Sequence, residues 1–274
     1  MFDKYLYALG KGVRSIRDAL DDQRHDGPPD PAKAKDITPA KTSPVTPTAL
    51  VRPYQAESSG MSSEPLPRSS AEIGKHPLIM GIVNVTPDSF SDGGRFFDLD
   101  KAVAHALQLA ADGADILDVG GESTRPGFDP VDGKEEISRV IPVISRIFRQ
   151  SPVPVSIDTM KAETAAAALA AGATIINDVW GFQFDRDMAR VAADGQVQCI
   201  LMHNREMDDP AIDIFEDVRA FLARSIDIAL GAGVRQENII LDPGIGFGKT
   251  NVQSLEMVRR LGDLKQAFGL PVLL

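Results

Sequence analysis

Polar side chains stand directly after short apolar runs at six successive points along the chain. The runs are typical of buried strands, and glycine- and proline-rich loops follow several of them. In parallel α/β folds, the carboxyl ends of the strands meet at one edge, where binding and catalysis take place. A helix cap or a turn would explain any one Asp or Asn, but six in succession predict one shared cavity. The residues are Asn84, Asp118, Asp158, Asn177 with Asp178, Met202 with His203 and Asn204, and Asp242.

A cation and a histidine accompany these residues. Arg125 precedes Pro126 in a loop, where a planar cation suits a carboxylate or a phosphate unless it is simply solvated. His203 is either a ligand contact or a core histidine with a hydrogen-bonded neighbour. No cluster of His and Cys with metal-ligand spacing occurs. Any metal is therefore expected to be a hard cation such as Mg²⁺, held by Asn84, substrate oxygens and water.

The glycine-rich segment from Asp242 to Lys249 is not a nucleotide-binding motif. A phosphate-binding P-loop needs glycine where Pro243 stands, and the dinucleotide fingerprint needs glycine where Lys249 stands. The glycines at alternate positions instead favour a tight turn beside a ligand, with Phe247 as an aromatic wall.

The elements that must position these residues alternate along the chain. Short apolar runs and helical patterns follow one another at spacings of about 25–40 residues, which indicates a parallel sheet. Seven strands with polar carboxyl ends favour a (β/α)₈ barrel over a doubly wound sheet. The strand candidates are residues 78–83, 115–119, 153–157, 173–177, 197–202, 238–242 and 270–274. The helix candidates are residues 99–112, 134–149, 161–171, 186–194, 212–231 and 252–267.

The composition is that of a globular protein, with 274 residues of which 43% are hydrophobic. The net charge of −10 argues against a nucleic-acid partner, and no apolar run is long enough to span a membrane. Cys199 is the single cysteine and is expected to be a buried, reduced thiol, which fits a cytoplasmic protein. An anionic substrate would need a locally positive site in this acidic chain.

Three regions are expected along the chain. Residues 1–22 have the apolar spacing of an amphipathic helix, which could dock on a protein, lie on a membrane surface or have no role. Residues 23–75 are rich in Pro, Ser, Thr and Ala and are expected to be a disordered linker. Residues 76–274 are expected to form the barrel domain.

The motifs at the strand ends resemble those of dihydropteroate synthases, in the family's order, over about residues 78–274. The most specific are Asn84-Val-Thr-Pro-Asp-Ser-Phe-Ser-Asp-Gly-Gly94 and Asp118-Val-Gly-Gly-Glu-Ser-Thr-Arg-Pro-Gly127. The others are Ser156-Ile-Asp-Thr159, Ile175-Ile-Asn-Asp178, Leu201-Met-His203 and Leu241-Asp-Pro-Gly-Ile-Gly-Phe-Gly-Lys249. The resemblance implies a pterin-binding barrel that joins a dihydropterin methyl diphosphate to 4-aminobenzoate and releases diphosphate.

The resemblance also implies a role for individual residues. The pterin pocket would comprise Asp158, Asn177, Met202, Asp242, Phe247 and the neighbourhood of Lys249. Thr124, Arg125 and Pro126 would form the aminobenzoate site, Asp92 and Arg125 would be catalytic, and Asn84 would hold Mg²⁺. These small molecules are the expected partners, and whether the protein is a homodimer stays open.

The sequence departs from the family pattern after the seventh strand. The pattern continues there with a Ser-Arg-Lys segment and an Arg-x-His segment, whereas this sequence stops at Leu274. We therefore expect an incomplete barrel, and a chain that is nearly inactive and prone to aggregate as given. Two alternatives to a synthase remain: the pterin-binding module of a corrinoid methyltransferase, and a non-catalytic paralogue.

Overall fold

A computed structural model describes residues 77–85, 95–122 and 130–274. Its strands are β1 (Met80–Asn84), β2 (Ile116–Gly120), β3 (Val155–Asp158), β4 (Ile175–Asp178), β5 (Gln198–Met202) and β6 (Ile239–Asp242). Its α-helices are α2 (Arg95–Ala111), α3 (Gly133–Gln150), α4 (Ala162–Ala171), α5 (Met188–Gly195), α6 (Ile214–Ala232), α7 (Asn251–Arg259) and α8 (Leu261–Phe268). A short 3₁₀ helix, η4 (Gln236–Asn238), precedes β6.

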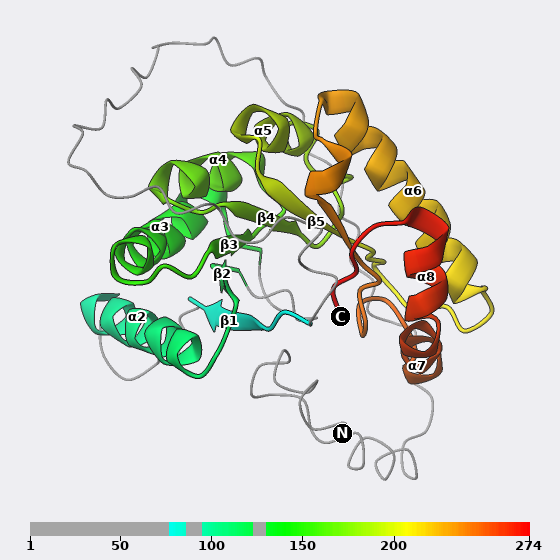
Figure 1. Cartoon of the computed structure of the whole chain (residues 1–274), viewed down its shortest axis with the longest axis horizontal. Coiled ribbons are helices and arrows are strands. Elements are labelled where there is room, and N and C mark those ends of the chain that lie inside the picture. The colour runs from blue at the N-terminus through cyan, green and yellow to red at the C-terminus, as the bar shows by residue number, and fades with distance from the viewer. Residues whose placement is uncertain (1–76, 86–94, 123–129) are drawn as a thin grey trace, which may run out of the picture. The chain divides into compact units, whose positions relative to one another are not determined.

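The described strands form one parallel sheet in sequence order, from β1 to β6. At least one helix follows every strand, and the helices lie along the outer side of the curved sheet (Figure 1). Consecutive parallel strands joined by helices are the repeating unit of the (β/α)₈ barrel. The predicted fold class is thus confirmed, with an incomplete barrel in the described part of the chain.

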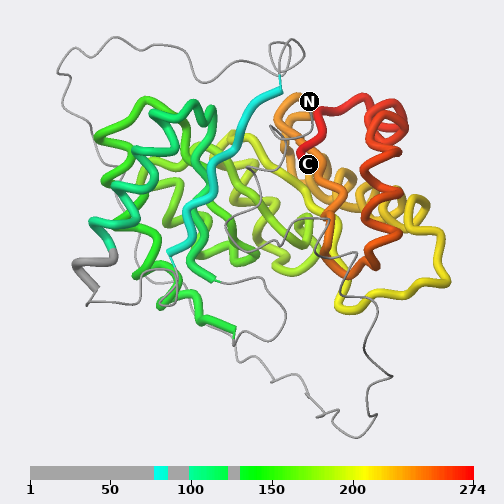
Figure 2. The backbone as a smooth tube through the Cα atoms, turned by 90° about the horizontal axis from the view of Figure 1, so that it is seen from below, coloured from blue at the N-terminus to red at the C-terminus, as the bar shows by residue number. Residues whose placement is uncertain are grey.

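The two faces of the sheet bury different residues because side chains alternate along a strand. Leu117, Ile157 and Leu201 belong to the larger core, together with apolar residues of the helices. The opposite face carries a smaller cluster formed by Met80, Ile116, Ile175, Ile200, Ile240 and Leu273. Met80 lies in β1 and Leu273 in the last segment, so this cluster joins the two ends of the curved sheet, and both tubes run close together in Figure 2. It forms the apolar floor of the barrel.

Local sequence signals explain where several helices begin and end. The side chain of Asp132 accepts a hydrogen bond from Glu135 N at the start of α3, and Thr250 and Gln253 form a capping box at α7. Gly172 ends α4 in the left-handed conformation, as its position after an Ala-rich helix predicted.

Six predicted strands and five predicted helices match observed elements, but two predictions about the end of the chain were wrong. The predicted helix over residues 252–267 is two helices, because the backbone of Arg260 leaves the helical conformation at φ −103° and ψ 15°. The guanidinium of Arg260 there lies 3.6 Å from the ring centroid of Phe215 and 3.0 Å from Asp263. The predicted strand over residues 270–274 makes only an isolated bridge, between Val272 and Leu241.

Other expectations have mixed outcomes. The thiol of Cys199 is buried, as predicted, and its Sγ lies 3.7 Å from the carbonyl oxygen of Asn238. None of the helices in the described ranges has both the length and the apolar character needed to cross a bilayer. The predicted helix over residues 1–22 and the linker over residues 23–75 lie outside the described residues, so these domain assignments stay predictions.

Candidate functional site

The strand register places the predicted polar residues on the same face as the apolar floor. Asp158 pairs with Gly120 on one side and with Asn177 on the other, and Met202 pairs with Asp242. Asn177 also pairs with Ile200, a residue of the floor. Because residues paired across parallel strands project to the same side, these side chains line the mouth of the barrel above its floor.

Two carboxyl-end residues leave buried acceptors without donors. Asn177 Nδ2 donates to Asp118 Oδ2 over 3.1 Å, and both side chains are buried. Asp118 Oδ1 and Asn177 Oδ1 have no hydrogen-bond partner among the described residues. A buried acceptor without a donor is costly, so such atoms indicate the position of a ligand's N–H groups. Two of them side by side suit a heterocycle with several donors.

Burial and mutual repulsion raise the pKa values of the carboxylates in this mouth. The pKa of Asp158 is well above its usual value, first because of burial and then because of the charges on Asp118 and Glu136. Burial also raises the pKa of Asp242 to about 6, although Gly244 N donates to its Oδ1 over 2.6 Å. Perturbed carboxylates that gather in one place are typical of functional sites.

Asn84 lies at the exposed edge of the same mouth. A side chain built on Gly120 would place its Cβ 3.7 Å from Asn84 Oδ1 and 3.3 Å from Asp158 Oδ2. Asn84 Oδ1 and Asp158 Oδ2 therefore both lie within 4 Å of the position that a Cβ on Gly120 would occupy. Because Gly120 has no side chain, both oxygens can come this close to its backbone.

Met202 and Phe247 supply apolar surface beside the carboxylates. Met202 is buried at the end of β5, where it pairs with Asp242. Phe247 is half-buried in the turn after β6, and its backbone N–H donates to Gly244 O over 3.1 Å. A flat ring system could lie between such side chains while its edge meets the carboxylates.

Two of the strand-end residues face away from the barrel mouth. Asp178 follows Asn177 and points to the helix side, where its oxygens accept from Trp180 N (2.8 Å) and Phe182 N (2.9 Å). Burial raises the pKa of Asp178 to about 6. His203 is fully buried and packs its ring edge-to-face on Phe221 of α6, with the centroids 4.9 Å apart. These two residues organise the turns behind the site.

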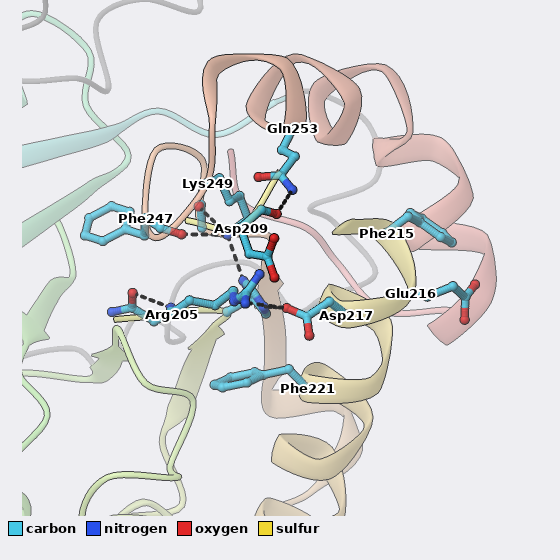
Figure 3. A network of polar contacts seen from close by, with 12 residues as sticks. Arg205, Asp209, Phe215, Glu216, Asp217, Phe221, Phe247, Lys249 and Gln253 are labelled. Atoms are coloured by element: carbon cyan, nitrogen blue, oxygen red, sulfur yellow. Dashed lines mark hydrogen bonds and ion pairs between the residues drawn. The ribbon is translucent and has the colours of Figure 1, made fainter. Parts of the chain in front are cut away.

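Lys249 is likewise directed into the protein. Its Nζ lies 2.7 Å from His203 Nδ1, and it donates to Gly244 O (2.7 Å) and Phe247 O (3.0 Å), as Figure 3 shows. The pKa of Lys249 is lowered to about 7, mainly by burial. The resemblance placed the neighbourhood of Lys249 in the pterin pocket, and the ammonium itself binds protein acceptors.

Sequence reasoning missed a half-buried lysine, Lys161, which is the N-cap residue of α4. Lys161 Nζ contacts Glu122 Oε2 and lies 2.9 Å from Glu136 Oε2, which also accepts from Thr164 Oγ1. No local motif marks this group, because its members come from three different elements. In the described ranges, no set of three or more His, Cys, Asp and Glu side chains is arranged to hold a metal. Asp92, Thr124, Arg125 and Pro126 lie outside the described residues.

Comparison with known proteins shows which family the chain belongs to. Residues 80–274 match a family described as pterin binding enzymes. The dihydropteroate synthase of Clostridium beijerinckii is 55% identical over 202 residues, which cover 74% of this chain and 74% of that protein.

Two crystal structures of relatives were determined with ligands. That of the Xanthomonas albilineans dihydropteroate synthase with 4-aminobenzoic acid is 45% identical, covers 72% of both chains and has a TM-score of 0.69. That of the Anaplasma phagocytophilum dihydropteroate synthase with 6-hydroxymethylpterin-monophosphate is 41% identical, covers 71% of this chain and 77% of the other, and has a TM-score of 0.67.

Proposed function

Because the chain belongs to the family of pterin-binding enzymes, we propose that it catalyses the dihydropteroate synthase reaction of folate biosynthesis. In this reaction the C–O bond between the pterin methylene group and diphosphate breaks. A C–N bond to 4-aminobenzoate forms, and the amine loses a proton. The protein is therefore a transferase whose substrates are a pterin diphosphate and an aromatic amine.

The observation that carries the proposal is the set of acceptors in the barrel mouth. One edge of a pterin offers adjacent N–H donors, which the carboxylate of Asp242 can accept as a pair. Asp158 and Asn177 would meet the opposite edge, where Asn177 Oδ1 has no other partner among the described residues. Met202 and Phe247 would enclose the faces of the ring.

The chemical step requires mainly positioning and charge stabilisation. As diphosphate departs, the pterin ring delocalises the developing positive charge, and the nearby carboxylates of Asp158 and Asp242 favour that charge. The amine then attacks from the opposite side of the methylene carbon. Holding the two reactants in line and excluding water removes much of the entropic cost of the reaction.

We propose Mg²⁺ as the cofactor and Asn84 as its protein ligand. Asn84 Oδ1 and Asp158 Oδ2 both lie within 4 Å of the position of a Cβ on Gly120, and both are hard oxygen ligands. Mg²⁺ typically takes only one or two protein oxygens and completes its shell with water and substrate phosphates. The donors present therefore fit the ion. When bound, Mg²⁺ would neutralise charge on the leaving diphosphate.

The remaining roles concern residues outside the described ranges. Thr124, Arg125 and Pro126 are proposed to bind 4-aminobenzoate, and Asp92 and Arg125 to take part in catalysis. They stand in the two segments whose sequences resemble the family most specifically. A reducing cytoplasm is the proposed compartment, which the single buried thiol of Cys199 fits.

An assay of the purified chain tests the proposal directly. The chain is mixed with dihydropterin methyl diphosphate, 4-aminobenzoate and Mg²⁺, and dihydropteroate is quantified by chromatography. Slow but detectable formation of dihydropteroate, dependent on both substrates, is the expected result. Pterin binding without product would indicate a non-catalytic paralogue, and tight binding of methyltetrahydrofolate would indicate a methyltransferase module. Either result would contradict the proposed reaction.

A further inference from the structure

The ammonium of Lys249 has no donor left for a substrate. An ammonium group carries three N–H donors, and three acceptors surround this one: His203 Nδ1, Gly244 O and Phe247 O, at 2.7, 2.7 and 3.0 Å. The side chain is only 7% exposed. Lys249 therefore satisfies protein groups, and its contribution to ligand binding must be indirect.

Two of the three acceptors belong to the turn that carries Phe247. Lys249 ties the turn at Gly244 and again at Phe247 itself, while Gly244 N donates to the carboxylate of Asp242 over 2.6 Å. The backbone of the turn packs tightly against the backbone of His203, because a Cβ on Gly244 would lie 1.9 Å from the carbonyl oxygen of His203. Any displacement of Lys249 would therefore shift both Phe247 and the hydrogen bond that orients Asp242.

The third acceptor links the turn to α6. His203 Nε2 lies 3.0 Å from Asp217 Oδ2, and because an ionised carboxylate only accepts, we assign the ring proton to Nε2 and leave Nδ1 to accept from Lys249. Arg205 Nε lies 3.7 Å from the same carboxylate oxygen. In Figure 3 the ring of Phe247 points away from α6, and Lys249 lies between Phe247 and Asp217. We call Lys249, His203 and Asp217 the Lys249 triad.

We propose that the Lys249 triad is a positioning device for the pterin site: it holds the turn after β6 so that Phe247 and Asp242 meet the pterin. This inference rests on the proposed function, since it assumes that the mouth of the barrel binds a pterin. Among the described residues, the hydrogen bonds of the triad connect the turn that carries Phe247 with α6. Its loss should therefore weaken pterin binding selectively, whereas a general loosening of the fold would affect both substrates.

The test compares four variants of the full chain. Lys249→Met removes the donors and keeps the length of the side chain, and Asp217→Ala removes the far end of the triad. Lys265→Met is the control for the first, because Lys265 is exposed on α8. Glu216→Ala is the control for the second, because it removes the neighbouring carboxylate from the same first turn of α6. Thermal unfolding establishes which variants are folded.

Calorimetry with 6-hydroxymethylpterin monophosphate supplies the main readout, and the KM for 4-aminobenzoate supplies the second. We expect the dissociation constant of the pterin to rise about tenfold or more in Lys249→Met and several-fold in Asp217→Ala. Both controls should match the wild type, and the KM for 4-aminobenzoate should stay unchanged. If Lys249→Met does not fold, Asp217→Ala decides alone.

Three results would overturn the inference while leaving the proposed function intact. The first is unchanged pterin affinity in folded Asp217→Ala, and the second is an equal loss of affinity for both substrates. The third is a folded Lys249→Met variant that binds the pterin as the wild type does. Failure of the wild type itself to bind the pterin would instead refute the proposed function, and the inference with it.

Discussion

Three features set the pKa of the Asp242 carboxylate: its burial, a backbone N–H donor and the charge of a buried lysine. Burial raises its pKa to about 6, and the N–H of Gly244 and the charge of Lys249 oppose that rise. The group therefore changes charge near physiological pH while facing the mouth of the barrel. A pterin that presents two N–H donors needs the ionised form, because a protonated carboxyl group would turn a donor of its own toward them.

Pterin affinity should therefore depend on pH through Asp242. Below about pH 6 the free carboxyl group binds a proton that the pterin must displace. Affinity should then fall by up to about tenfold for each unit of pH, and it should level off above pH 6. Calorimetry with 6-hydroxymethylpterin monophosphate between pH 5 and pH 8 measures this dependence.

Asp242→Asn is the matched variant for that experiment. It keeps the shape of the side chain but loses charge-assisted bonds, each of which contributes about 1.5–3 kcal/mol. We expect weak binding at neutral pH and a flatter profile between pH 5 and pH 6. A variant profile as steep as that of the wild type would assign the titration to another carboxylate, such as Asp158, and unchanged affinity would remove Asp242 from the site.

The proposed role of Asn84 leads to a separate prediction about Mg²⁺. Diphosphate should bind more tightly with Mg²⁺ than with a chelator, because the described mouth contains the carboxylates of Asp118, Asp158 and Asp242. Asn84→Ala should reduce that difference by removing a hard oxygen ligand. A titration of wild type and variant, each with and without chelator, measures both effects. Equal diphosphate affinity in all four samples would exclude the metal role.

At the scale of elements, the turn after β6 shows how backbone shape sets the site. Gly244, Gly246 and Gly248 have φ values of +64°, +84° and +54°, which side-chain-bearing residues rarely adopt. Gly244 also has the carbonyl oxygen of His203 in the place of a Cβ, whereas a Cβ on Gly246 would meet no atom within 4 Å. A substitution at Gly246 therefore tests the cost of a positive φ alone, whereas a substitution at Gly244 adds a steric clash.

Alanine substitutions at these two glycines should have different costs. Gly246→Ala should destabilise the protein by about 1–2 kcal/mol, the cost of a positive φ. Gly244→Ala should cost about 1–3 kcal/mol more, because its methyl group displaces the backbone of His203. It should also weaken pterin binding, since Gly244 holds Asp242. Chemical denaturation and calorimetry measure the two effects, and equal losses of stability would show that the turn relaxes easily.

The elements also show what sequence patterns could and could not predict. Apolar runs that end in Asp or Asn located six strands and placed Asp158, Asn177 and Asp242 at their ends, because strand and cap signals are local. The Lys249 triad was missed, since Asp217 reaches His203 only through the packing of α6 against the turn. The break at Arg260 was missed too, because the nearby Gly262 lies inside α8 and the contact of Arg260 with Phe215 is not local.

At the scale of the whole molecule, the net negative charge of the protein opposes the binding of an anionic substrate. The protein carries a net charge of −10, and the described part of its mouth is acidic, yet the proposed pterin substrate is an anionic diphosphate. The raised pKa of Asp158 reflects the same crowding of carboxylates. Local cations must therefore offset the field of the protein at the diphosphate. Arg125 and Mg²⁺ are the proposed sources of that positive charge.

The last prediction concerns the segment that precedes the barrel. Residues 23–75 are poor in large apolar side chains. Such a composition cannot bury enough surface to repay the entropy lost on ordering. Deletion of residues 1–75 should therefore shift the midpoint of thermal unfolding by less than about 2 °C, which corresponds to under about 1 kcal/mol.

A slightly longer deletion is the matched control for that experiment. Removal of residues 1–82 would also take away Met80, which belongs to the apolar floor, and Gly81 and Ile82, which pair with β2. Loss of a buried methionine alone costs about 2–5 kcal/mol, and the loss of strand pairing adds to it, so this variant should unfold at a much lower temperature. The contrast between the two deletions locates the boundary of the folded domain between residues 75 and 83. A large loss of stability in the shorter deletion would instead show that the amphipathic segment 1–22 packs on the barrel.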